Sequence, residues 1–265
     1  MMDHKKYKCY VDGSHGFIGT HLVNKLKELG WTVVRGDRDG NLPSQVDYIF
    51  SLASYGNYHY QDNPSETFLA NVTRLITLLS QVKKIKGIVL TSSSSVLLPT
   101  KTFYSVSKQT IEGLAEVYDL PIVVARPSTI IGIGEAEHHL IPKLINSCFT
   151  SVKMDFVKSP IHDFLAVDDY VEAIIKMAQN AKKLKGKTLN VSMGKSLSNE
   201  EIKNIVERQA GSKASVKYVK SLRSYDSKHW IVKPAKELKK LGWKPKVKIE
   251  KIIDEMITEA SLNRI

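Results

Sequence analysis

The sequence has little cysteine, no long apolar run and a shortage of acidic side chains. Its 265 residues include only Cys9 and Cys148, which are too few for a disulfide framework and do not have the spacing of metal ligands. No apolar run approaches the roughly 20 residues that cross a bilayer, and the charged start MMDHKKYK contains no signal region. We therefore expect a cytoplasmic protein with no membrane contact and no metal site.

The shortage of acidic residues leaves a strongly basic chain. Lys and Arg number 39 against 27 Asp and Glu, a formal net charge of +12. Such a balance attracts anions, which include nucleic acids, membrane surfaces and phosphorylated small molecules. The basic clusters, such as AKKLKGK at 181–187, lack the interleaved aromatic residues of a single-strand-binding surface. We therefore interpret them as solvated surface and do not expect nucleic acid as a partner, while attraction of a diphosphate substrate remains open.

The first half of the chain alternates apolar strands with amphipathic helices. Strands are expected at 7–13, 31–37, 46–53, 87–92 and 120–127, and helices at 20–30, 66–84 and 104–118. Alternation of this kind predicts a doubly wound parallel sheet covered by helices.

Beyond residue 134 the alternation loosens. Helices are expected at 141–149, 167–181, 198–211 and 248–261, and short strands at 187–193 and 215–220. Ser198 followed by Glu201 is the pattern of a capping box. We expect residues 1–134, with parts of 160–195, to form one domain, and residues 135–265 to form mainly a small lobe.

A glycine-rich loop links the first strand to the first helix. Gly13, Gly16 and Gly19 lie in GSHGFIG, and such glycines allow a tight turn and close approach to a pyrophosphate at the helix N-terminus. Asp37 ends the second expected strand, where a carboxylate can bind the ribose hydroxyls of an adenosine. Arg35 and Arg38 instead favour NADP, because an arginine there could hold its 2′-phosphate. The combination predicts a dinucleotide site with NAD preferred over NADP.

Several longer motifs of the chain follow one another in the order of a known family pattern. VDGSHGFIGTHLVNKLKELGWTVVRGD is similar to the pattern VTGxxGFIGxxLxxxLxxxGxxVxxxD, and NP followed by NV at 63–72 is similar to NPxxxxxxNVxGT. ARPSTIIGIG, HDFLAVDDYVEA and ELKKLGWKPKVKIEKII resemble RPxNVYGPG, RDFxxVxDxxxA and the closing LGWxPxxxLxxGI. Together these motifs resemble the extended short-chain dehydrogenase/reductase family, and in particular its NAD-dependent nucleotide-sugar epimerase/dehydratase branch.

The resemblance implies an α/β fold, a Rossmann-type doubly wound parallel sheet with a small C-terminal α/β substrate lobe, and a homodimer. Residues 1–134, with parts of 160–195, would then be the dinucleotide-binding domain, and residues 135–265 mainly the small substrate-binding lobe.

The resemblance assigns a proton-transfer triad to the stretch TSSSSVLLPTKTFYSVSK at 91–108. Ser93 would hold the substrate oxygen, Tyr104 would be the general acid and base, and Lys108 would hold the nicotinamide ribose. Lys108 lies one helical turn after Tyr104, and its ammonium is expected to lower the pKa of the tyrosine from about 10. The remaining serines of the cluster can be turn residues, which is the interpretation we favour for Ser92.

The resemblance also implies the residues that hold the ligands. For the cofactor they are Gly13, His15, Gly16, Phe17, Ile18, Gly19, Asp37, Arg38, Leu52, Ala53, Ser54, Tyr104, Lys108 and Pro127. For a nucleotide-diphosphate sugar they are Ser94, Thr129, His162, Arg223 and Asp226. His162 stands in place of an arginine of the family pattern, so a structural role for it is equally consistent.

Departures from the pattern narrow the chemistry. Ser94 and Ser95 occupy the places of the acidic groups that drive elimination or decarboxylation in the family. His139 matches an acid of the fucose-forming enzymes, but Ser95 replaces their partner cysteine, which disfavours epimerisation beside a ketone. What remains is hydride chemistry at one carbinol, as in 4-epimerisation or 4-keto reduction.

Other departures concern the ligand pockets. Asp12 replaces a threonine beside the glycine loop, where a carboxylate is unfavourable unless it faces away. The segment after Asp37 is short, and Leu97, Ile131 and Thr129 replace residues of the usual sugar pocket.

Two other classes of function stay open. One is an extended-type reductase of a carbonyl substrate that carries no nucleotide. The other is a non-catalytic relative that binds a dinucleotide or RNA. The presence of Ser93, Tyr104 and Lys108 argues against a non-catalytic protein.

Overall fold

The computed structural model describes residues 7–36, 45–58, 60–220 and 232–262. The chain divides into two compact units. The first consists of Met1–Pro127, Val171–Val191 and Ala235–Trp243, and the second of Ser128–Tyr170, Ser192–Pro234 and Lys244–Ile265. Within the described residues, no helix is both long enough and apolar enough to cross a lipid bilayer.

The first unit is built on a six-stranded parallel sheet. Its strands are β1 (Lys8–Asp12), β2 (Thr32–Arg35), β3 (Tyr48–Ser51), β4 (Gly87–Thr91), β5 (Ile122–Pro127) and β10 (Thr188–Val191). Their order is β10-β5-β4-β3-β1-β2, and every neighbouring pair is parallel. The order reverses between β1 and β3, and in open α/β sheets ligands bind beyond the carboxyl ends of the strands at such a switch point. The predicted Rossmann-type α/β fold is confirmed.

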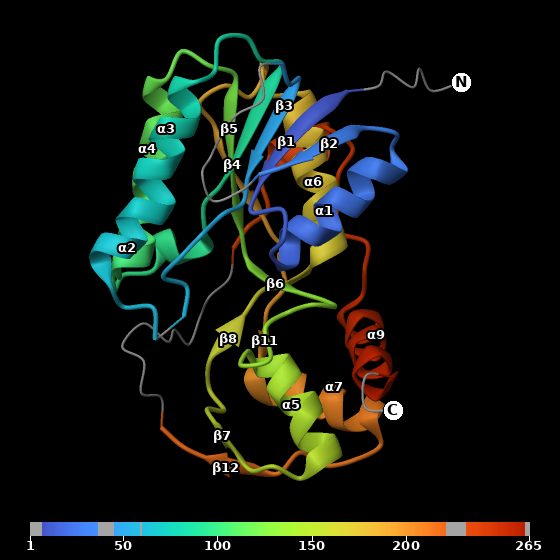
Figure 1. Ribbon diagram of the computed structural model, residues 1–265. Helices are drawn as coiled ribbons and strands as arrows, with labels where there is room; N and C mark the ends of the chain where they lie inside the picture. The colour runs from blue at the N-terminus through green and yellow to red at the C-terminus, as the bar shows by residue number, and fades with distance from the viewer. Residues whose placement is uncertain (1–6, 37–44, 59, 221–231, 263–265) are drawn as a thin grey trace. The chain divides into compact units, whose positions relative to one another are not determined.

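Helices cover both faces of this sheet. They are α1 (Phe17–Glu28), α2 (Pro64–Phe68), α3 (Arg74–Ser80), α4 (Phe103–Val117), α6 (Val167–Gln179) and α8 (Lys236–Lys240). Figure 1 shows α2, α3 and α4 on one side of the sheet and α1 and α6 on the other. The central strands β3, β4 and β5 are almost wholly buried, as expected for strands covered on both faces.

The expected long helix at 66–84 is interrupted. A π-helical turn, Leu69–Thr73, separates α2 from α3, and α3 ends at Ser80. Leu75, Leu78 and Leu79 of α3 belong to the apolar core under the sheet and are at most 4% exposed. They are therefore core residues of the first unit.

In the described part of the second unit, three helices pack beside short strand pairs. Its helices are α5 (Leu140–Thr150), α7 (Asn199–Ala210) and α9 (Ile249–Leu262). The strand pairs are β6 (Thr129–Ile131) with β9 (Phe164–Ala166), β7 (Met154–Phe156) with β12 (Val216–Tyr218), and β8 (Ile161–His162) with β11 (Leu197–Ser198). Ser198 and Glu201 form the predicted capping box at the start of α7. A separate apolar core lies between these helices and strands.

Candidate active site

The glycine loop passes from the end of β1 into α1 in a conformation that only glycines permit. Gly13 has φ +80°, and a Cβ there would lie 2.6 Å from the backbone nitrogen of Ala53. A Cβ on Gly19 would lie 2.0 Å from the carbonyl oxygen of Gly13. Gly16 caps α1 without a side chain, and the first turn of the helix carries no acidic residue. The uncapped N–H groups and the positive end of the helix dipole suit a bound phosphate.

A cavity of about 360 Å³ opens at this loop, and all of its lining belongs to the first unit. The lining residues are Asp12, Gly13, Ser14, His15, Gly16, Gly36, Ala53 and Arg74. They come from the carboxyl ends of β1, β2 and β3 and from the start of α3. The cavity therefore lies at the switch point of the sheet, and its open backbone cradle fits the diphosphate part of a dinucleotide.

Several residues assigned to the cofactor by resemblance lie at this cavity or next to it. Gly13, His15, Gly16 and Ala53 line it. Phe17, Ile18 and Gly19 form the first turn of α1. Leu52 and Ser54 flank Ala53 after β3, and Pro127 ends β5.

Arg35, the last residue of β2, contacts the glycine loop. The Arg35 guanidinium lies 3.4 Å from Nδ1 of His15 and 3.5 Å from the carbonyl oxygen of Ser14. Asp37 and Arg38, on which the preference between NAD and NADP was argued, lie outside the described residues.

The serine cluster follows β4 and begins a short 3₁₀ turn, Ser94–Leu97. The Ser93 hydroxyl precedes this turn and accepts the backbone N–H of Ser95 at 3.2 Å. Tyr104 comes from the first turn of α4, and its phenol is hydrogen-bonded to the side chains of Ser93 and Ser54. Two of the three residues that the resemblance assigns to the triad thus lie in contact, together with Ser54.

Lys108 is the third member, one turn further along α4. Its side chain is 1% exposed, and its ammonium donates to the carbonyl oxygen of Thr91 at 2.9 Å. The nitrogen lies 5.7 Å from the centre of the Tyr104 ring. Burial lowers the pKa of Lys108 to about 8, and the nearby Asp12 carboxylate opposes this shift.

The expected lowering of the Tyr104 pKa is wrong for the structure described here. Burial raises the pKa of Tyr104 above its usual 10, and the hydrogen bonds from Ser93 and Ser54 oppose this only in part. The Lys108 ammonium faces the ring and is held by a backbone carbonyl, so its charge does little for the phenol oxygen. Spacing along a helix predicts that two side chains share a face, but not how far apart their end groups lie.

A buried asparagine that sequence reasoning left without a role supports the triad. Asn71 lies in the π-helical turn and is 2% exposed. Its amide makes two hydrogen bonds of 2.8 Å with the backbone of Tyr55 and donates to the Ser107 hydroxyl at 2.9 Å. It therefore joins the loop after β3 to α4, beside Tyr104 and Lys108. The NV motif was the signal that could have identified it.

Ser92 has the structural role that the sequence favoured. Its hydroxyl donates to Glu112 on α4 at 2.5 Å. Glu112 also accepts two hydrogen bonds from Arg126 of β5, which donates in turn to Asn190 of β10. This buried chain of contacts ties α4 to the strands that carry the serine cluster.

The substrate residues expected from resemblance fall into three groups. Ser94 is buried beside Ser93 in the first unit. Thr129 lies in β6 and His162 in β8 of the second unit, where the His162 ring packs edge-on against Phe164. Arg223 and Asp226 lie outside the described residues.

Asp163, next to His162, organises loops of the second unit. It is 1% exposed and accepts hydrogen bonds from the Ser128 hydroxyl at 2.9 Å and from the backbone of Met193 and Gly194 at 2.8 and 2.7 Å. Burial raises the pKa of this carboxyl, and these hydrogen bonds, with a fourth from the backbone of Lys195, oppose the shift.

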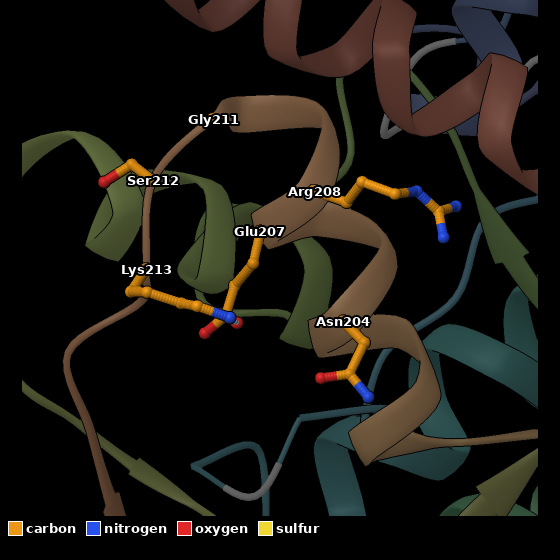
Figure 2. A pocket seen from close by; sticks show the side chains of 6 residues that line it. All are labelled: Asn204, Glu207, Arg208, Gly211, Ser212 and Lys213. Carbon is orange, nitrogen blue, oxygen red and sulfur yellow. Dashed lines mark hydrogen bonds and ion pairs between the residues drawn. The ribbon is translucent and has the colours of Figure 1, made fainter.

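A second cavity, of about 540 Å³, lies at the C-terminal end of α7. It is lined by Asn204, Glu207, Arg208, Gly211, Ser212 and Lys213 and contains none of the expected site residues. Figure 2 shows the Lys213 side chain reaching the Glu207 carboxylate, with which it forms an ion pair at 2.8 Å. Glu207 also pairs with Lys203 at 3.3 Å. Its carboxylate is thus used inside the unit, and the cavity has no grouping typical of a catalytic site.

A glycine loop at the switch point of a parallel sheet is typical of α/β proteins that bind dinucleotides. Residues 9–192 match the model of the NAD dependent epimerase/dehydratase family. The chain belongs to this family, and the resemblance seen in the sequence is confirmed.

Known relatives are distant but cover most of the chain. The CDP-abequose synthase of Salmonella typhimurium is 25% identical over 93% of this chain and 96% of its own. The GDP-6-deoxy-D-talose 4-dehydrogenase of Aggregatibacter actinomycetemcomitans is 26% identical over 71% of this chain and 74% of its own. Among solved structures, MoeE5 in complex with UDP-glucose and NAD has a TM-score of 0.86 at 22% identity, covering 96% of this chain and 99% of its own.

Proposed function

We propose that this protein is an NAD-dependent enzyme that transfers a hydride at one carbinol of a nucleotide-diphosphate sugar, as a 4-epimerase or a 4-keto reductase. The observation that carries the proposal is the cluster in which the Ser93 and Ser54 hydroxyls bond to Tyr104 with Lys108 beside its ring. The relatives support the substrate class, since they are named for CDP- and GDP-linked sugars. The name of one relative places its chemistry at position 4.

The residues of the chain suggest how the work is divided. Gly13, Gly16 and the N-terminus of α1 would hold the diphosphate of the cofactor, and Lys108 its nicotinamide ribose. When bound, NAD supplies the hydride acceptor that side chains lack. Ser93 would hold the reacting oxygen of the sugar, and Tyr104 would take or return its proton. Thr129, His162, Arg223 and Asp226 are retained as proposed substrate contacts.

Substitution of the triad tests this proposal. Tyr104→Phe should abolish turnover but leave folding and NAD affinity nearly unchanged, because only the phenol oxygen is removed. Ser93→Ala should cost on the order of 10²–10⁴-fold in rate, the usual scale for a positioned proton-transfer group. Both variants would be assayed with CDP-, GDP- and UDP-linked sugars, and NAD binding would be measured by calorimetry. Substantial turnover by Tyr104→Phe would refute the assignment.

A homodimer remains part of the proposal, although the buried leucines of α3 do not support it. Large apolar side chains are exposed on the π-helical turn, α3 and α4, which lie on one side of the sheet. They include Leu69 at 58%, Ile76 at 40%, Phe103 at 56% and Val106 at 38%. A contiguous apolar patch is typical of surfaces that meet a partner, and these four residues mark the helices on which we place the proposed subunit contact. A cytoplasmic location is also retained, and the two cysteines, Cys9 and Cys148, support it because both are free and buried.

A further inference from the structure

An ion pair lies in the wall of the glycine-loop cavity. Arg74, the first residue of α3, places a guanidinium nitrogen 3.6 Å from a carboxylate oxygen of Asp12, the last residue of β1. Both side chains line the cavity that contains the glycine loop. Asp12 is thus a carboxylate placed where the proposed function requires the diphosphate of a dinucleotide.

The Asp12 side chain is 14% exposed, and the Ser51 hydroxyl lies 3.5 Å from the carboxylate oxygen that does not pair with Arg74. Two cations act on it: Arg74 directly, and Lys108 through a longer-range attraction. Burial raises the pKa of Asp12 and both cations oppose the shift. A carboxylate and a diphosphate repel each other at short range unless a positive charge lies beside them.

The two residues also depart together from the family pattern. Asp12 stands at the threonine of VTG, and Arg74 stands at the glycine of NVxGT. The family pattern has an uncharged residue at both positions, whereas in this chain Asp12 and Arg74 carry opposite charges and form an ion pair. The positive residue therefore lies where it can compensate the negative one.

We propose that Arg74 is a charge-neutralising residue of the dinucleotide site, which cancels the Asp12 carboxylate so that the glycine loop can accept a diphosphate. This inference rests on the proposed function, because it assumes that a dinucleotide binds at the loop. The competing explanation is that the pair only fixes the start of α3 to the end of β1. The two explanations differ in what happens when both charges are removed.

The test is a double-mutant cycle with two ligands. Wild type, Asp12→Asn, Arg74→Gln and the double variant Asp12→Asn/Arg74→Gln would be titrated calorimetrically with ADP-ribose, which carries the diphosphate. Adenosine, which has no phosphate, would be measured by displacement of ADP-ribose. Arg208→Gln removes the same charge at the second cavity, in the other unit, and serves as the matched control. Thermal unfolding of each protein without ligand would report on the fold.

We expect Arg74→Gln to weaken the binding of ADP-ribose about tenfold or more, equivalent to about 1.4 kcal/mol. The affinity for adenosine should change less than threefold. The double variant should recover to within about threefold of wild type, because no unpaired carboxylate remains. Arg208→Gln should bind both ligands like wild type. Unchanged ADP-ribose binding by Arg74→Gln, or a double variant as weak as the single one, would overturn the inference. An equal loss of affinity for ADP-ribose and adenosine in Arg74→Gln would show that the Asp12–Arg74 ion pair is purely structural. If the wild type binds neither NAD nor ADP-ribose, the proposed function itself is refuted.

Discussion

Replacing Lys108 with methionine should change how the stability of the protein depends on pH. The folded chain buries this ammonium almost completely, which lowers its pKa from 10.5 to about 8. The unfolded chain keeps the proton up to about pH 10.5, so between about pH 8 and 10.5 it binds more protons at this site than the folded chain does. The contribution of this site to stability therefore rises with pH through that window, and it is lost as the pH falls from about 10.5 to about 8.

The size of the effect follows from the pKa. A tenfold change in proton affinity is worth about 1.4 kcal/mol, so the full drop in the Lys108 pKa, from 10.5 to about 8, is worth about 3 kcal/mol. Linkage places about 2 kcal/mol of this between about pH 7 and pH 9.5. The free energy of unfolding of wild type, relative to Lys108→Met, should therefore increase by about 2 kcal/mol over that interval. The difference between the two proteins cancels the titration of all other groups.

Urea unfolding at several pH values measures this quantity. Lys183→Met is a matched control, because Lys183 is exposed on the turn after α6 and should follow wild type at every pH. If the difference between wild type and Lys108→Met stays constant to within about 0.5 kcal/mol, the buried ammonium carries no such penalty and the reasoning fails.

Three further predictions concern separate parts of the chain. Asn71→Ala should lower the free energy of unfolding by about 2–4 kcal/mol, because the three hydrogen bonds of this amide are lost; a loss below about 1 kcal/mol in urea titrations would show that the amide is dispensable. Asp37→Ala should narrow or invert an NAD preference over NADP that we expect to be about tenfold, or about 1.4 kcal/mol; tighter NADP binding by wild type in calorimetry would contradict the assignment of Asp37. Val106→Glu should shift the protein toward monomers in light scattering at micromolar concentration, and a wild type already monomeric there would rule out the dimer.

The sequence predicted those features that depend on local pattern. The glycine loop, the strands of the sheet and the start of α4 follow from short-range spacing, and the described structure has each of them. Ser93 and Tyr104 were paired from the resemblance, and the structure brings their hydroxyls together. Periodicity also found the apolar face of α3, but it could not say whether that face meets the core or another subunit.

What the sequence could not supply are contacts between segments far apart in the chain. The link from Asn71 to Ser107 spans 36 positions, and the ion pair of Asp12 with Arg74 spans more. The direction of the Tyr104 pKa depends on how deeply the phenol lies and on where the Lys108 nitrogen is held. Neither follows from a spacing of four residues.

The order of strands in the sheet bears on how the protein can be dissected. A fragment that ends at residue 134 would retain the glycine loop and the whole triad but would lack β10. β5 would then become an edge strand with its N–H and C=O groups exposed, a template for pairing with other chains. Gly87, against which the backbone of Ala178 packs too closely for any side chain, would lose that cover as well. Aggregation of such a fragment would therefore say nothing about its chemistry, and a minimal enzyme has to keep the segment Val171–Val191, which returns to the sheet from much later in the chain.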